Sequence, residues 1–99
     1  MQAFSVTLEA RNPDRQHYRS YAVSAGRDLF GAWIVEIRCG RIGCAGTLVT
    51  YSADDEPAAR KLVRQCLARR RGAPKRIGVP YQITDATDAG DWLIDNANL

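Results

Sequence analysis

Several residue types are scarce in this chain of 99 residues, and each scarcity argues against a class of protein. No apolar run approaches the roughly 18 residues that a membrane-spanning helix needs, so we expect no membrane partner. The single histidine is His17, and the three cysteines form no Cys-x-x-Cys pair. The common ligand spacings of zinc sites are therefore missing. His17 is also the one imidazole that could act as a general base.

The cysteine count also bears on the compartment. Cys39, Cys44 and Cys66 are an odd number, and the first ten residues show neither the charged start nor the apolar stretch of a secretion signal. We expect reduced thiols in a cytoplasmic protein. Two alternatives remain: a zinc site made by the cysteines with His17, and a nucleophilic Cys39 between two arginines, for which no base is identifiable. We predict no cofactor, no metal site and no catalytic residue.

Lysine is almost absent among the basic residues, since twelve of the fourteen are arginine. Arginine suits planar, bidentate contact with phosphate better than lysine does. The net charge of +3 is unevenly distributed, because residues 38–76 carry ten bases and three acids, whereas residues 77–99 carry four aspartates and no base. Such a basic block is typical either of a solvated helix face or of a surface that binds a polyanion.

Alternation of apolar and polar residues predicts most of the strands. Four segments have this pattern, and they are residues 4–9, 18–23, 30–39 and 47–51, the third of them central to the sheet. Turn signals at residues 12–14 and 25–28 separate the first three. A shorter alternation of Val79, Tyr81 and Ile83 predicts a last strand. The aromatic residues of the first four segments are expected in the core rather than in a stacking surface, and they include Tyr18, Tyr21, Trp33 and Tyr51.

The period changes after Tyr51. Apolar residues then recur at spacings of three and four, at Ala59, Leu62, Val63, Cys66 and Leu67, which predicts one amphipathic helix. Ser52 or Asp54 can cap its start, and the three arginines before Gly72 lie at the negative end of its dipole. The fold class is therefore predicted as α+β, an antiparallel β-sheet of four to five strands with one amphipathic helix packed on it.

A glycine-rich loop joins the third and fourth predicted strands, with the sequence Arg-Cys-Gly-Arg-Ile-Gly-Cys-Ala-Gly at residues 38–46. Glycine allows backbone N–H groups and flanking guanidinium groups to converge on an anion, although a tight hairpin turn uses the same residues. Combined with the basic face of the helix, the loop yields five candidate nucleic-acid-binding residues. These are Arg38, Gly40, Arg41, Arg64 and Arg71.

The order of these features resembles the WGR domain. The resemblance rests on Gln16-His17-Tyr18 before the second strand, the apolar strand that runs into Cys-Gly-Arg-Ile-Gly, the single helix and a later Gly-x-Pro-Tyr segment, and it covers residues 5–83. WGR domains occur in poly(ADP-ribose) polymerases, where they contact DNA at a break and neighbouring domains, and in small bacterial proteins. The resemblance implies an antiparallel sheet with a helix on one side, in a non-enzymatic binding module.

One residue departs from the family pattern. The tryptophan that gives the family its name is Cys39 here, while the family's glycine and arginine correspond to Gly40 and Arg41. The resemblance implies that this tryptophan stacks on a nucleotide at a DNA end and that the arginine contacts the backbone. Stacking is worth about 1–3 kcal/mol per base, and a thiol supplies almost none of it. We therefore expect weak, salt-dependent contact with DNA or another polyanion through charge.

The last residues are predicted to form an acidic tail at 85–99, beyond a WGR-like domain at 1–84. Four aspartates surround Trp92 in this tail. Trp92 either completes the core, which we favour, or belongs to a tail that docks on the basic block and masks it. The alternative function is a protein–protein interaction or assembly module without nucleic-acid binding, in which the exposed sheet and the Trp92 tail contact a partner chain.

Overall fold

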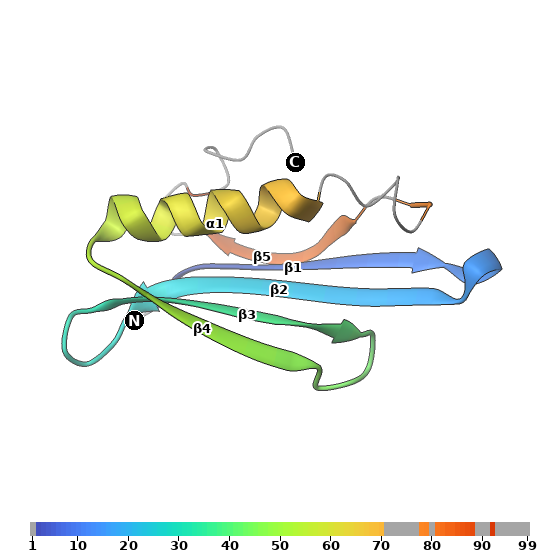
Figure 1. Cartoon of the computed structure of the whole chain (residues 1–99), viewed down its shortest axis with the longest axis horizontal. Helices are drawn as coiled ribbons and strands as arrows, with labels where there is room; N and C mark the ends of the chain where they lie inside the picture. The colour runs from blue at the N-terminus through green and yellow to red at the C-terminus, as the bar shows by residue number, and fades with distance from the viewer. Residues whose placement is uncertain (1, 71–77, 80, 89–91, 93–99) are drawn as a thin grey trace.

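The chain folds into a five-stranded antiparallel sheet with an α-helix packed on one face (Figure 1). A computed structural model describes residues 2–70, 78–79, 81–88 and 92. In chain order the elements are β1 (Gln2–Asn12), the 3₁₀ turn η1 (Pro13–Arg15), β2 (His17–Arg27), β3 (Trp33–Arg41), β4 (Thr47–Ala53), α1 (Glu56–Arg70) and β5 (Gln82–Asp88). The predicted α+β fold class is confirmed.

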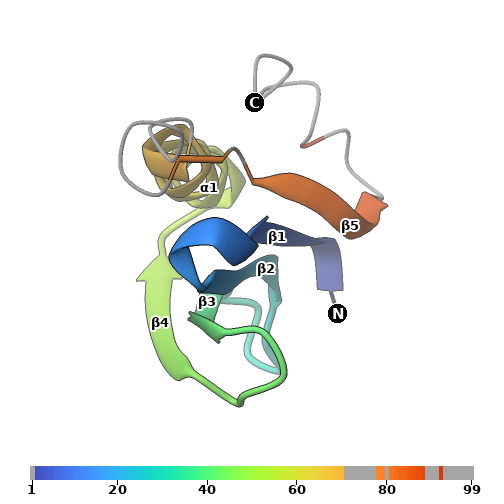
Figure 2. The ribbon, with the colours of Figure 1, turned by 90° about the vertical axis from the view of Figure 1, so that its right-hand side faces the viewer.

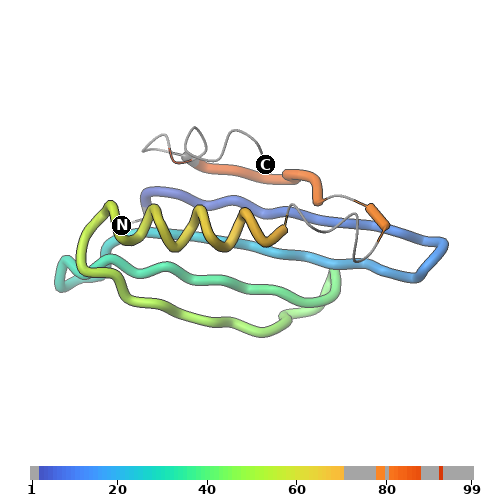
Figure 3. The backbone as a smooth tube through the Cα atoms, turned by 45° about the horizontal axis from the view of Figure 1, so that its top comes forward, coloured from blue at the N-terminus to red at the C-terminus, as the bar shows by residue number. Residues whose placement is uncertain are grey.

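The strands lie in the order β4-β3-β2-β1-β5, and every neighbouring pair is antiparallel. The first four strands follow one another as hairpins, after which the chain crosses the sheet through α1 and adds β5 beside β1 (Figure 3). β3 is an interior strand, as predicted, and the glycine-rich loop joins it to β4 in an antiparallel hairpin. β4 and β5 are therefore the two edges of the sheet.

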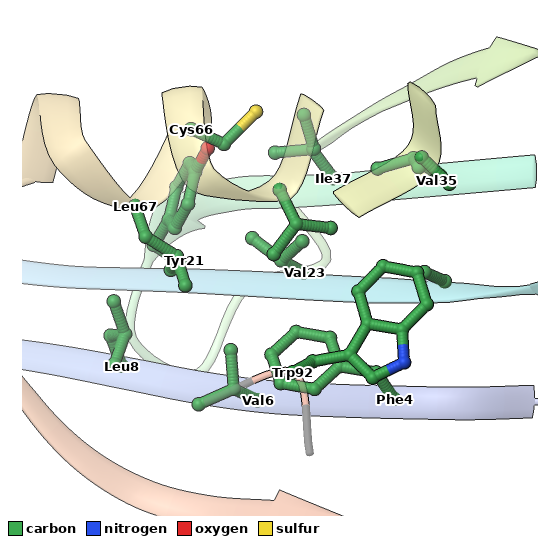
Figure 4. Close-up of a cluster of buried hydrophobic side chains, with 13 residues drawn as sticks. Phe4, Val6, Leu8, Tyr21, Val23, Val35, Ile37, Cys66, Leu67 and Trp92 are labelled. Carbon is green, nitrogen blue, oxygen red and sulfur yellow. The ribbon is translucent and has the colours of Figure 1, made fainter. Parts of the chain in front are cut away.

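The core lies between α1 and the face of the sheet that it covers (Figure 4). Alternate residues of the three inner strands point into it, and the helix contributes most of its predicted apolar stripe. The fully or nearly fully buried members include Phe4, Val6, Leu8, Tyr21, Val23, Val35, Ile37, Ala59, Val63, Cys66 and Leu67. Leu62, the remaining stripe residue, is half-buried. The period of 3.6 in the sequence therefore identified the helix face correctly.

The start of α1 differs from the prediction in its cap. The backbone N–H of Ala58 donates to Oδ1 of Asp55 at 2.9 Å, so Asp55 is the N-cap rather than Ser52 or Asp54. Pro57 occupies the first turn, where a missing N–H costs nothing. No helix in the described part of the chain combines the length and the apolar character that a membrane span needs.

Replacing Asp55 with alanine tests this assignment. We expect the free energy of unfolding to fall by about 1 kcal/mol, because one helix N–H loses its acceptor. Urea titration followed by circular dichroism measures the change. Asp54→Ala is the matched control, since Asp54 is an exposed neighbour of the same charge. An equal loss in both variants would contradict the assignment of the cap.

The second and third strands have different bounds from those predicted. β2 continues through Arg27, so the turn expected at residues 25–28 begins only at Asp28, and β3 starts at Trp33 instead of Phe30. Oδ1 of Asp28 accepts hydrogen bonds from the N–H groups of Phe30 (2.8 Å) and Ala32 (3.0 Å), which closes the turn. Phe30 is consequently 94% exposed, although it belongs to the longest apolar run of the sequence.

The end of the described chain also differs from the prediction. The last strand starts at Gln82 and ends at Asp88, later than the Val79–Ile83 alternation indicated. Asp85 pairs with Thr7 within this strand, so this part of the predicted tail belongs to the sheet edge away from the glycine-rich loop. Masking of the basic block by the tail stays a prediction. The tail's other aspartates, Asp91 and Asp95, lie outside the described residues.

Trp92 completes the core, as we favoured. Its ring stacks on Phe4 with centroids 5.7 Å apart, lies at the same distance from Trp33, and leaves 1% of the residue exposed. The guanidinium carbon of Arg60 lies 4.6 Å from the Trp92 ring centroid and covers it. Contact of Trp92 with a partner chain, part of the alternative function, is therefore contradicted, because the side chain is fully occupied within the fold.

Candidate nucleic-acid interface

The shape of the glycine-rich loop depends on two glycines that lie against each other. A Cβ on Gly40 would stand 2.8 Å from the Cα of Gly46, and a Cβ on Gly46 would overlap the carbonyl oxygen of Cys39. Gly46 also has a φ of +70°, in the left-handed region that favours glycine. The two sides of the loop therefore approach closely where β3 ends and β4 begins, which accounts for both glycines structurally.

Arg38, an exposed residue of β3, also stabilises this loop. Its Nη1 donates to the carbonyl oxygen of Ala45 at 2.9 Å, across the turn. Two backbone bonds add to it, from Ile42 N–H to the Tyr18 carbonyl and from Cys44 N–H to the Arg41 carbonyl, both at 3.0 Å. The alternation along β3 places Arg38 on the face of the sheet away from α1. Arg38 and Arg41, which flank the same cysteine and glycine in sequence, thus have different roles.

Arg41 lies at the end of β3, directly opposite Arg19 of β2. The guanidinium carbon of Arg41 is 5.5 Å from the centroid of the Tyr18 ring, a cation–π arrangement. Like charges in a cross-strand pair repel each other. Neither arginine has an ion-pair partner among the described residues. The pair therefore concentrates positive charge that an anion from outside can neutralise.

A hollow of about 430 Å³ lies beside this pair, between the last turn of α1 and the ends of β2, β3 and β4. Figure 1 shows that this end of α1 and the β3–β4 loop are at the same end of the molecule. The lining consists of Arg19, Ser20, Cys39, Gly40, Thr47, Arg70 and Tyr81. None of these described lining residues is acidic, so the hollow is positive and has hydroxyl groups on its walls.

Arg70 reaches the hollow from α1 and is held by an aromatic ring. Its guanidinium carbon lies 4.1 Å from the centroid of the Tyr21 ring, and Tyr21 is 3% exposed. Burial raises the pKa of the Tyr21 hydroxyl, and the neighbouring Cys66 thiol raises it further. Tyr21 is thus neutral at physiological pH. It orients Arg70 without cancelling its charge.

The five candidate residues do not form a single cluster. Gly40 lines the hollow of about 430 Å³, and Arg41 lines a smaller hollow beside it with Arg19. Arg38 lies on the face of the sheet away from α1, where it hydrogen-bonds to Ala45. Arg64 is exposed on α1, one turn after Arg60, whose guanidinium carbon covers the Trp92 ring. Arg64 precedes Arg70, the last residue of α1, by six positions, or about 9 Å of helix. Arg71 lies outside the described residues.

Sequence reasoning missed Arg19 and Arg70 at this end of the molecule. Arg19 becomes visible only through the β2–β3 register, which places it opposite Arg41. Arg70 was interpreted with its neighbours as a residue that balances the helix dipole, and it does lie in the last turn. One signal was available in the sequence. Arg19 continues the alternation of Tyr21 and Val23, whose side chains face α1, and is the residue at which that face changes from apolar to charged.

The thiols and the histidine occupy separate environments. Cys66 is buried in α1, Cys39 is half-buried against the core, and Cys44 is exposed in the loop; all three are free. No group of three potential metal ligands occurs among the described residues. His17 starts β2 and lines a small hollow with Tyr18, Arg19 and Arg41.

Some of the aromatic residues of the strands lie in the core and others are exposed. Tyr21 is in the core and Trp33 packs against it, as predicted, with Tyr81 meeting the Tyr21 ring edge-on at 6.4 Å. Tyr51 is 43% exposed, so its predicted place in the core is wrong. Tyr51 lies opposite the buried Val35 and therefore on the face of the sheet that α1 covers. It remains exposed because β4 is an edge strand. Tyr18 lies beside Arg41.

Comparison with known protein families finds one match. The family model described as the WGR domain matches residues 4–73. The matched span contains β2, β3, β4, α1 and all but the first two residues of β1, and it ends before β5 and Trp92. No curated protein and no solved structure matches the chain.

Proposed function

Because the chain belongs to the WGR domain family, whose domains are binding modules of the nucleic-acid type, we propose that it binds the phosphate backbone of DNA without catalysing a reaction. Arg41 and Arg19 make the main contacts beside the glycine-rich loop, and Arg70 adds a third charge from α1. The observation that carries the proposal is the hollow at this end of the sheet, whose described lining contains Arg19, Arg70 and no acidic residue, with Arg41 directly opposite Arg19 in the neighbouring strand. Guanidinium groups bind phosphate oxygens in a bidentate manner.

The remaining candidates have supporting parts in this proposal. Arg38 positions the loop through its bond to Ala45, and Gly40 lets the loop close. Arg64 and Arg71 attract DNA over a longer range and do not contact it directly. Such attraction raises the rate at which the protein associates with DNA more than it raises the affinity. A cytoplasmic location also belongs to the proposal, in keeping with three free cysteines.

Weak binding without sequence preference follows from Cys39. Its side chain is half-buried against the core and offers no aromatic face to a base, while the charged residues that line the hollow are cations. Affinity that comes from charge alone falls steeply as salt rises, because each phosphate contact releases condensed counterions. We therefore propose contact with the DNA backbone along its length rather than recognition of a DNA end.

The salt dependence of binding tests this proposal. With a fluorescein-labelled DNA duplex, fluorescence anisotropy over a series of salt concentrations yields the slope of log affinity against log salt. Arg41→Ala and Arg19→Ala are each expected to reduce the magnitude of that slope by about one unit, with equal effect on unrelated sequences. Circular dichroism checks that both variants remain folded.

Arg27→Ala provides the matched control, since Arg27 is an exposed arginine of the same strand at its opposite end. We expect this variant to keep the slope of the unmodified protein. Absence of binding at low salt, or a slope that Arg41→Ala and Arg19→Ala leave unchanged, would contradict the proposal. Either result would favour the alternative, an interaction module without nucleic-acid binding.

A further inference from the structure

β4 is an edge strand without the features that usually prevent edge-to-edge pairing. Its seven residues, Thr-Leu-Val-Thr-Tyr-Ser-Ala, contain no charge, proline or glycine. It pairs with β3 on one side, and no described strand lies on the other (Figure 2). Monomeric proteins commonly protect such an edge with charged side chains, proline or a bulge. β4 therefore presents unpaired backbone groups in a row that another strand can use.

The opposite edge of the sheet has the protection that β4 lacks. β5 carries acidic residues, among them Asp85, and the β1–β5 register shifts between Thr7 and Leu8, which marks a bulge or irregularity. A strand approaching β5 would meet negative charge and a locally distorted edge. The contrast within one sheet indicates that β4 is the edge available for pairing.

Apolar side chains are also concentrated on β4. Six large apolar side chains are exposed among the described residues, and three of them belong to this strand: Leu48 (46%), Val49 (38%) and Tyr51 (43%). Val49 lies opposite Ile37 and Tyr51 opposite Val35, both of which are buried. Val49 and Tyr51 are therefore the uncovered rim of the core, whereas Leu48, opposite Arg38, lies on the other face of the sheet. A strand added to this edge would cover them.

We propose that the strand added to this edge is β4 of a second copy of the chain, antiparallel and centred on Thr50. In this register Val49 faces Tyr51 of the second copy and Leu48 faces Ser52, so a β-branched residue pairs with an aromatic one on the side of the core. Because β4 has no charge, its two-fold pairing with itself places no like charges opposite each other. The self-complementary pattern favours a second copy over an unrelated partner.

The resulting dimer has a continuous sheet and is closed, since each copy uses β4, the one unprotected edge among the described strands. The two glycine-rich loops would lie at opposite ends of the joined strands, each next to the start of its own β4. The interface shares no residue with the basic hollow except Thr47 at its rim. The dimer proposal therefore stands independently of DNA binding.

Charge substitution at the centre of the interface tests the proposal. In a Thr50→Glu dimer the two glutamates would face each other across the two-fold axis, flanked by Glu36 of each chain, which lies opposite Thr50 in the β3–β4 register. Light scattering after size-exclusion chromatography is expected to show a concentration-dependent dimer for the unmodified protein and a monomer for Thr50→Glu. Thermal unfolding of the variant verifies its fold.

Mixing provides the stricter test. Thr50→Lys mixed with a tagged Thr50→Glu chain is expected to restore a dimer that contains one copy of each. Thr87→Glu, the same kind of change on the other edge strand, should leave the dimer unaffected. A monomer at every concentration of the unmodified protein, open-ended association, or an equal loss of the dimer in Thr87→Glu would overturn the proposal.

Discussion

Replacing Trp92 with alanine is expected to lower the free energy of unfolding by about 3–5 kcal/mol, the range for large-to-small changes of buried aromatic residues. The side chain is 1% exposed, stacks on Phe4 and contacts Trp33, so its removal leaves a cavity between aromatic rings. Arg60 would lose the ring that it covers. Urea unfolding monitored by far-ultraviolet circular dichroism measures the loss.

Two further variants make the Trp92 prediction specific. A chain that ends at Asp88 keeps β5 but removes Trp92, and it should lose as much stability as Trp92→Ala. Leu29→Ala is the control for an apolar truncation, because Leu29 is 99% exposed and its replacement should change stability very little. If Trp92→Ala were as stable as Leu29→Ala, the placement of Trp92 in the core would be wrong.

The position of Trp92 matters for the family comparison as well. The matched span ends at residue 73, so the match lacks one of the largest fully buried side chains. Residues beyond the matched span therefore supply part of this core. Shortening the protein to the matched span is expected to remove the fold and, with it, any DNA binding, even though the basic hollow is lined mainly by residues inside that span.

Replacing Gly46 with alanine is expected to cost about 2–4 kcal/mol, from a left-handed backbone conformation and from overlap with the backbone. A Cβ at this position meets the carbonyl of Cys39, which is part of the β3–β4 hairpin and can move only if the loop changes shape. A change in the shape of the loop should also weaken the hydrogen bond from Arg38 to the carbonyl oxygen of Ala45. Thermal unfolding and the backbone amide spectrum of the loop would report both effects.

Gly43→Ala separates the two causes of this loss. Gly43 has a φ of +86°, comparable to that of Gly46, yet a Cβ there meets no atom within 4 Å. The expected loss is about 1–2 kcal/mol, from the backbone conformation alone. Equal losses in the two variants would show that the close approach of the hairpin backbone contributes nothing.

The predictions from sequence succeeded where they depended on local periodicity. The helix stripe and the alternation of Val35 and Ile37 repeat every 3.6 or two residues, so the buried face can be recognised without knowledge of the neighbours. The first and last residues of the helix and strands were predicted less accurately, because single hydrogen bonds determine where these elements begin and end. Asp28 closes a turn within an apolar run, and Asp55 rather than Asp54 caps α1, and composition does not distinguish such neighbours.

The candidate site was predictable only in part, for a related reason. Gly40 and Arg41 belong to one short motif, so they were found together and lie together. Arg19 and Arg70 are distant from it in sequence and join it through strand register and helix packing. Arg64 lies on α1 one turn after Arg60 and does not line the hollow.

The class of fold, the buried face of α1 and the glycine-rich hairpin can be recognised in the amino-acid sequence, because each depends on side chains a few residues apart. The edge strands, the packing of Trp92 and the arginines that share a hollow become known only from the folded chain. Those features result from contacts between distant segments, whose burial and pairing a linear pattern does not contain. For this chain, they separate Arg38, which hydrogen-bonds within the loop, from Arg19 and Arg70, which line the hollow.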